Sequence, residues 1–272
     1  MAINIGRLSI EPIYDGTLIA DPPSALLPGL TPADCQEHVD LLNSEGLLEL
    51  GVGGFLVRGY DGRVVLVDTG YGADHPRCGT LKNSLHAAGV EPAQVTDVVF
   101  THLHQDHIGG VAERGVVSFP NATYRCHVAD WTYFAEPRGA DRAAPDQEKL
   151  SVLLGRLEPW DSNASILPGF DVVEAPGHTP GSSVIVLSDH QQRLMLLGDV
   201  VHCALQLLEA EWATLYDVDP ELALKTRRNL VREVEGSATL VTGGHFPGLS
   251  FGRLLEGQGK VRFTFHTPTS AS

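Results

Sequence analysis

The sequence predicts an α/β fold, because patterns typical of strands and of helices alternate in both halves of the chain. In the N-terminal half, the apolar and β-branched run 95–100 ends where a dense group of histidines begins. In the C-terminal half, the apolar run 193–197 precedes a helical stretch that opens at Asp219 and Pro220. The chain has 272 residues, 43% of them hydrophobic, so it can bury a large core, and we expect one domain over residues 1–272.

The N-terminal half is expected to begin with a strand over residues 8–14, where apolar and polar residues alternate. Residues 15–45 are rich in Pro, Leu and Ala without clear periodicity, so we expect a surface segment of ordered loops. The Asp61-Gly62 pair lies between two apolar runs and predicts a hairpin of residues 54–59 and 63–68. We then expect a helix and two strands, over 81–88, 95–100 and 122–128.

The C-terminal half is expected to open with a helix over residues 145–157, where four leucines recur at helical spacing: Leu150, Leu153, Leu154 and Leu157. A second helix is expected from Pro220 to Glu235, with Asp219 as its N-cap and Gly236 after its end. Apolar runs predict strands over 171–174, 183–187, 193–197 and 238–242.

Charge and cysteine usage exclude several classes of partner. The net charge of −15 works against nucleic-acid binding, because affinity for a phosphate backbone comes mainly from Lys and Arg. The first seven residues have neither the charged nor the apolar region of a signal peptide, and no later run is long enough to span a membrane. The four cysteines are scattered without C-x-x-C spacing, as expected of reduced thiols. We therefore expect a cytoplasmic protein with no membrane partner.

Residues 102–107 carry the strongest chemical signal, because three histidines and a carboxylate fall within six positions. Alternate side chains of an extended chain share a face, so His102, His104 and Asp106 can point one way while His107 serves a neighbouring position. That geometry indicates two metals close together. Imidazole with carboxylate favours zinc over iron, manganese or cobalt. The structural alternative is a cluster of imidazoles hydrogen-bonded at a strand end.

The stretch 101–110, Thr-His-Leu-His-Gln-Asp-His-Ile-Gly-Gly, resembles the signature of the metallo-β-lactamase-fold hydrolases. Four further stretches resemble motifs of that family in the same order: 67–70, 175–181, 197–199 and 243–245. The resemblance implies a four-layer αββα sandwich with a metal site at the seam between the two halves. It also suggests that residues 15–45 can cover the mouth of the site, which we state as a hypothesis.

The resemblance also implies the ligands of two divalent ions, with zinc expected. His102, His104 and His178 would hold one ion, Asp106, His107 and His245 would hold the other, and Asp199 would bridge them. The last three motifs each follow an apolar strand and contain glycines, which suits a site built from distant segments. For Asp68, two interpretations stay open: a turn-former, or support for the metal-binding loop.

The implied chemistry is hydrolysis by a metal-bound hydroxide, with Asp106 shuttling a proton to the leaving group. No convincing serine nucleophile elbow is present in the sequence. His202 stands where lactone-degrading members carry a tyrosine, three residues after Asp199. It could donate a hydrogen bond to substrate or leaving group, or it could support the site. Phe246 and Trp212 are candidates for an apolar pocket wall.

Among substrates we favour a small ester or lactone, of the acyl-homoserine-lactone or aryl-ester type. Residues 198–202 and 245–248 resemble the methyl-parathion-hydrolase-like enzymes, so an organophosphate triesterase is the main alternative. A glyoxalase II-like thioesterase is weakened by the lack of a basic cluster for a glutathione carboxylate. Two further alternatives are not hydrolases: a mononuclear iron persulfide dioxygenase, and a metal-stabilised scaffold without turnover. A homodimer is left open.

Overall fold

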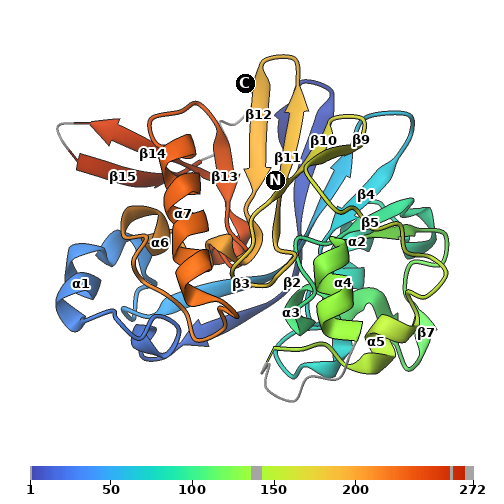
Figure 1. The fold of residues 1–272 in the computed structure, drawn as a ribbon, viewed down its shortest axis with the longest axis horizontal. Helices are drawn as coiled ribbons and strands as arrows, with labels where there is room; N and C mark the ends of the chain where they lie inside the picture. Colours follow the sequence, from blue (N-terminus) through green and yellow to red (C-terminus); the bar gives the residue numbers. More distant parts are fainter. Residues whose placement is uncertain (1, 136–142, 258–259, 267–272) are drawn as a thin grey trace.

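Two β-sheets lie face to face, and helices cover the outer face of each (Figure 1). The computed structural model describes residues 2–135, 143–257 and 260–266. The first sheet has the order β1-β2-β3-β4-β5-β8 and the second the order β15-β14-β13-β12-β11-β10-β9. The arrangement is the predicted four-layer αββα sandwich.

The first sheet is built from the N-terminal half of the chain. Its strands are β1 (Ile3–Ile5), β2 (Leu8–Ala20), β3 (Leu48–Arg58), β4 (Val64–Val67), β5 (Asp97–Val99) and β8 (Thr123–Arg125). A separate small hairpin pairs β6 (Ala112–Glu113) with β7 (Val116–Val117). The predicted Asp61-Gly62 turn joins β3 to β4, with positive φ at both residues.

The second sheet is built from the C-terminal half. Its strands are β9 (Ala164–Leu167), β10 (Phe170–Glu174), β11 (Ser183–Asp189), β12 (Gln192–Leu196), β13 (Leu240–Thr242), β14 (Gly252–Gly257) and β15 (Lys260–Phe265). The strands β12 and β13 are parallel, so both carboxyl ends lie at the same edge of the sheet.

Helices α6 (Leu205–Leu208) and α7 (Pro220–Val234) flank the second sheet, while α2 (Leu81–Ala87), α4 (Val128–Ala135) and α5 (Gln147–Ser151) flank the first (Figure 1). The remaining α-helices are α1 (Pro32–Glu37) and α3 (Gln105–Ile108). Short 3₁₀ helices occur at η1 (Pro23–Ala25), η2 (Val39–Leu41), η3 (Gly72–Asp74), η4 (Pro92–Gln94), η5 (Gly109–Val111), η6 (Gly198–Val200) and η7 (Pro247–Leu249). None of the helices in the described ranges is long and apolar enough to cross a membrane.

Three apolar clusters hold the layers together. One lies between the sheets and joins side chains such as Val67 and Val99 to Ile185 and Leu196. The other two lie between each sheet and its helices. The loops that follow β5 and β12 meet at one end of the sandwich, where His102 Nε2 lies 4.0 Å from Asp199 Oδ2.

The N-terminal segment differs from the expectation of loops from residue 15 to 45. Strand β2 continues to Ala20, because it pairs along its length with β3, which begins at Leu48 rather than near residue 54. The first half of β3 is hard to recognise as a strand from the sequence, because it contains glycines, which have low strand propensity. Gly51 is nevertheless suited to its place, because a Cβ there would lie 2.6 Å from the Phe246 carbonyl oxygen.

The helix expected over residues 145–157 was wrong in length. Helix α5 ends at Ser151, and the chain turns so that Leu153 is buried while Leu154 is 67% exposed. Gly155 then takes a φ of +77°, which a continuing helix cannot contain. The predicted helix after Asp219 is confirmed: the Asp219 carboxylate accepts a hydrogen bond from the Leu222 N–H at 3.0 Å.

Candidate metal centre

The loop after β5 carries the first four predicted ligands, and Asp68 holds that loop in place. The Asp68 carboxylate accepts hydrogen bonds from the Thr101 N–H at 2.9 Å and the Thr101 hydroxyl at 2.8 Å. It also lies 2.9 Å from His107 Nδ1. Asp68 therefore ties both ends of the histidine motif together, which favours loop support over the turn-former interpretation.

Gly109 and Gly110 let a neighbouring loop approach the motif closely. A Cβ on Gly109 would overlap the Tyr71 carbonyl oxygen, and a Cβ on Gly110 would overlap that of Thr69. The Thr69 N–H and hydroxyl both donate to the His107 carbonyl oxygen, at 2.6 and 2.8 Å. Gly109 and Gly110 thus allow close packing against residues 69–71. They do not start helix α3, which begins before them, at Gln105.

The His178 loop joins β10 to β11 and is fastened to the first motif by Asp130 of α4. The buried Asp130 carboxylate accepts from the Leu103 N–H at 2.9 Å, the Gly181 N–H at 2.6 Å and the Thr179 hydroxyl at 2.9 Å. One carboxylate therefore holds two loops that are distant in sequence. Burial raises the pKa of Asp130, and its hydrogen bonds oppose that rise.

The stretches 197–199 and 243–245 place Asp199 and His245 beside these two loops. Gly198 has a φ of +52° and its Cβ position is 2.8 Å from the Thr101 Cβ, so the turn after β12 can approach the first motif only with glycine. A Cβ on Gly244 would overlap the Asp199 carboxylate. His245 Nδ1 donates to the Gly51 carbonyl oxygen at 3.0 Å.

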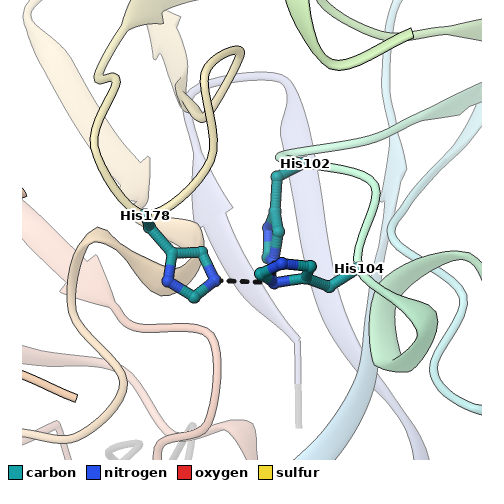
Figure 2. Close-up of side chains that lie close together, drawn as sticks. All are labelled: His102, His104 and His178. Carbon is teal, nitrogen blue, oxygen red and sulfur yellow. Dashed lines mark hydrogen bonds between the residues drawn. The ribbon is translucent and has the colours of Figure 1, made fainter. Parts of the chain in front are cut away.

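The seven predicted ligands are brought together in two groups. His102, His104 and His178 form one group, and Figure 2 shows their imidazoles pointing toward one another. Asp106, His107, Asp199 and His245 form the other group, and within each group the potential ligand atoms lie within 4.8 Å of one another.

Asp199 lies between the two groups. Its carboxylate oxygens are 3.5 Å from His178 Nε2, 3.3 Å from His107 Nε2 and 3.2 Å from His245 Nε2. Asp106 approaches His245 Nε2 at 3.2 Å. A carboxylate in this position could serve an ion held by either group.

The donor spacing in the first group is near that around a tetrahedral ion for one pair of nitrogens and shorter for the other. Two nitrogens about 2.05 Å from such an ion lie about 3.3 Å apart. In the first group, His104 Nδ1 is 3.2 Å from His102 Nε2 and 2.8 Å from His178 Nε2. Outside the centre, Nδ1 of His178, His107 and His245 each faces an oxygen acceptor, so Nε2 of each would be the nitrogen that binds a metal ion. The residues therefore fit a divalent metal site.

The electrostatics also favour cations. Burial lowers the pKa of His102 well below its usual value and lowers that of His178 to about 4. Burial acts in the same direction on His107, but the carboxylates of Asp199, Asp68 and Asp106 outweigh it and raise the pKa to about 10. Burial also acts to lower the pKa of His245, but Asp199 and Asp106 outweigh it, so this pKa is raised well above its usual value. Without metal, these two imidazolium ions balance the buried carboxylates, and bound cations would replace their protons.

His202 also reaches the centre. Its Nε2 is 3.1 Å from Asp199 Oδ2, and its ring meets that of His178 edge-on at a centroid distance of 4.9 Å. The His202 backbone N–H donates to Gln206 Oε1 at 2.8 Å. His202 thus contacts a predicted ligand and also borders the cavity described next.

A cavity of about 230 Å³ opens directly above the two groups. Its wall contains the site residues His104, Asp106, His178, Asp199, His202 and His245. The rest of the described wall is aliphatic or aromatic and comes mainly from β2, η1 and β3, with one residue each from three loops: Leu18, Ile19, Ala20, Ala25, Leu26, Leu50, Tyr71, Ala143 and Tyr216.

The pocket wall expected from Phe246 and Trp212 was wrong. Phe246 is completely buried and packs edge-on against Phe263 at 5.3 Å, behind the site. Trp212 packs against the second sheet's core and meets His38 at 5.9 Å. The sequence analysis missed the real wall residues. Tyr71 could have been found from the sequence, since it directly follows the Asp68-Thr69-Gly70 turn.

Comparison with known families identifies the architecture. The family model described as "Metallo-beta-lactamase superfamily" matches residues 54–245, which include every predicted ligand. The chain belongs to the metallo-beta-lactamase superfamily. This confirms the predicted family and fold, and the superfamily match accounts for the order of the ligand-bearing loops.

Curated relatives within the superfamily are metallo-hydrolases and lactonases by name. A "probable metallo-hydrolase" of Mycobacterium tuberculosis is 30% identical over 179 residues, which cover 52% of this chain and 54% of that protein. An N-acyl homoserine lactonase of Bacillus thuringiensis is 26% identical over 169 residues, or 61% of each chain. The match therefore spans only about half to three-fifths of these relatives.

Solved structures of the superfamily match almost the whole chain. The dizinc quorum-quenching lactonase AidC, solved with a product, has a TM-score of 0.87 at 23% identity, covering 99% of this chain and 98% of that one. The hydrolase AbOPH has a TM-score of 0.81 at 24% identity, covering 100% and 98%. At these identities the likeness establishes the shared fold.

Proposed function

We propose that this protein is a dinuclear zinc hydrolase that cleaves a small ester or lactone, of the acyl-homoserine-lactone or aryl-ester type. The observation that carries the proposal is the position of the cavity, which has the metal-binding groups at its base and an aliphatic wall above them. An uncharged ester places its carbonyl at the base and its apolar group against the wall. The names of the curated relatives, metallo-hydrolases and N-acyl homoserine lactonases, support the same class.

The first group would hold one ion and the second group the other, with Asp199 shared. Two divalent ions there would supply Lewis acidity and activate a water for attack on the carbonyl carbon. Asp106 borders the cavity, and we assign it the transfer of a proton from that water to the leaving alkoxide. His202 contacts Asp199, so we assign it the orientation of that carboxylate, with its ring edge available to the substrate.

The N-terminal segment provides the substrate wall in this proposal. Leu18, Ile19 and Ala20 at the end of β2, with Ala25 and Leu26 after it, line the cavity. An acyl chain packed there would remove apolar surface from water at about 25 cal/mol per Å². We therefore expect the rate to depend on the length of the acyl chain.

The glyoxalase II-like alternative requires cations for the carboxylates of glutathione. No Lys or Arg occurs among the described residues that line the cavity. An organophosphate triester is uncharged and would meet the same apolar wall, so it remains the second candidate.

The deciding experiment measures the metal content of the protein as purified by mass spectrometry and then assays that sample, without reloading, on a substrate panel. The panel contains acyl-homoserine lactones of increasing chain length, aryl esters, a paraoxon-type triester, S-lactoylglutathione and glutathione persulfide. We expect two metals per chain and the highest kcat/KM on a lactone or aryl ester. A higher kcat/KM on the triester would reverse our ranking, and one iron with persulfide oxidation would refute the hydrolase.

Asp199→Asn separates a catalyst from a metal-stabilised scaffold. Since Asp199 lies between the two groups, the amide should lower kcat by about a hundredfold or more, as expected when a catalytic electrostatic group is lost. The matched control is Asp40→Asn, which makes the same change at an exposed position of η2. Equal activity of the two variants would contradict the proposal.

A further inference from the structure

Arg227 of α7 is the largest side chain that is completely buried among the described residues. A buried guanidinium is costly unless every donor finds an acceptor. Here Nε donates to the Val200 carbonyl oxygen at 2.8 Å, and Nη1 donates to those of Ala210 at 3.0 Å and Trp212 at 3.2 Å. Nη2 pairs with Asp217 Oδ2 at 3.3 Å. One cation is therefore bonded to three backbone sites and one carboxylate.

The carboxylate connects Arg227 to the metal centre. Asp217 Oδ1 accepts from His178 Nδ1 at 3.0 Å, while its Oδ2 faces Arg227. Asp217 is buried, and burial tends to raise its pKa, but His178 and Arg227 on either side more than offset this and keep the pKa low. The result is a continuous chain, Arg227 to Asp217 to His178, that ends on a nitrogen facing the first metal group.

The backbone bonds connect the same guanidinium to two other parts of the site. Val200 directly follows Asp199, so the bond to its carbonyl fixes the turn that presents the shared carboxylate. The Trp212 carbonyl oxygen also accepts from Gln206 Nε2 at 2.7 Å, and Gln206 holds the His202 backbone N–H. The segment 210–217, which carries the cavity residue Tyr216, is thus fastened to the metal-binding turn.

The imidazoles of the second metal group are held by other contacts. His107 is oriented by Asp68, and His245 by the Gly51 carbonyl oxygen, both of which belong to the first sheet's half of the molecule. The histidines of the two groups therefore have separate supports, while Asp199 is shared. A change at Arg227 should act most strongly on the group that contains His178.

We propose that Arg227 is a positioning residue which, through Asp217, orients His178 for the first metal ion and couples that ion to the cavity wall at residues 210–217. The inference rests on the proposed dinuclear centre but not on the proposed substrate. Lysine cannot replace arginine here, because one ammonium group has neither the reach nor the planar fork to bond three carbonyls and a carboxylate together.

The test is a zinc titration of Arg227→Met against a chromophoric chelator, with metal-free wild type as reference. Loss of an outer partner of a metal-bound histidine typically costs about 10-fold to 100-fold in affinity. We expect one of the two binding steps to weaken by that factor and the other to change clearly less. Asp68→Asn should weaken both steps, because Asp68 bonds Thr101 beside His102 as well as His107. Arg228→Met changes the next residue of the helix, which is exposed and paired with Glu211, and should change neither step.

Asp217→Asn carries the test if Arg227→Met does not fold, because it preserves the volume while removing the charge and one acceptor. Asp217→Asn should weaken the same step. Where Arg227→Met folds, the double variant should cost less than the sum of the two single changes, since both act through one path. Equal weakening of both steps, unchanged affinities, or full additivity would each overturn the inference. Metal titration uses no substrate, so a failure of the proposed esterase activity would leave this result readable.

Discussion

Asp130→Asn tests whether a single buried carboxylate holds the two histidine loops together. The substitution keeps the shape of the side chain but converts one oxygen into an NH₂ group. Asp130 accepts two backbone N–H groups, from Leu103 and Gly181, on different oxygens. Whichever way the amide is turned, one of these buried N–H groups must face another donor.

The magnitude follows from the hydrogen bonds. A buried N–H left without an acceptor costs about 1–3 kcal/mol, and the remaining bonds each lose about 1 kcal/mol when the acceptor is no longer charged. Removing a buried charge returns part of this, because burial already raises the pKa of Asp130. We expect a net loss of about 2–3 kcal/mol in the free energy of unfolding.

Urea unfolding of the metal-free protein measures this loss directly, and Asp40→Asn is the surface control, expected to stay within about 0.5 kcal/mol of wild type. The variant should also bind zinc more weakly in the step assigned to His102, His104 and His178, since Leu103 and Thr179 adjoin those ligands. A loss no larger than that of the control would refute the role given to Asp130.

Three further predictions concern protons and the cavity. The pKa of His107 is raised to about 10 and that of His245 is also raised, so zinc binding near pH 7 should release about two protons from these histidines. Calorimetry in buffers of different ionisation enthalpy counts the released protons. Release of no protons would contradict the assignment of these two histidines as ligands. Tyr71 lines the cavity, and we expect its hydroxyl to donate a hydrogen bond to the substrate. Tyr71→Phe removes this donor and should lower kcat/KM about threefold to tenfold at unchanged metal content. An unchanged kcat/KM would show that the hydroxyl does not reach the substrate. Hydrogen bonds from Tyr60 and Arg7 lower the pKa of Asp189 to about 2. Asp189→Asn should therefore lower the free energy of unfolding by its full amount above pH 4, and this loss should shrink as the pH falls toward 2. A loss in urea unfolding that does not change with pH would exclude this cause.

The sequence by itself determined the α/β class and the first cluster of candidate ligands, because both depend on strong local patterns, whereas the four-layer arrangement and the distant ligands were implied by the family resemblance. The run 95–100 and the motif 102–107 predict a buried strand that ends in ligands, and the structure places β5 and its loop there. The cap at Asp219 defined a helix start from two adjacent residues. Such features are readable because the interactions that cause them lie within a few residues of one another.

The cavity wall and the supports of the centre were decided only by the tertiary structure. Phe246 follows a ligand in the sequence, yet it points into the core, because its side chain fills the space beside Phe263. Arg227 looks like an ordinary charged residue of a helix, and only the packing of α7 surrounds it with carbonyls from 200 to 212. A residue acquires such a role when chain segments far apart in sequence leave it buried acceptors, and no local pattern records where those segments meet.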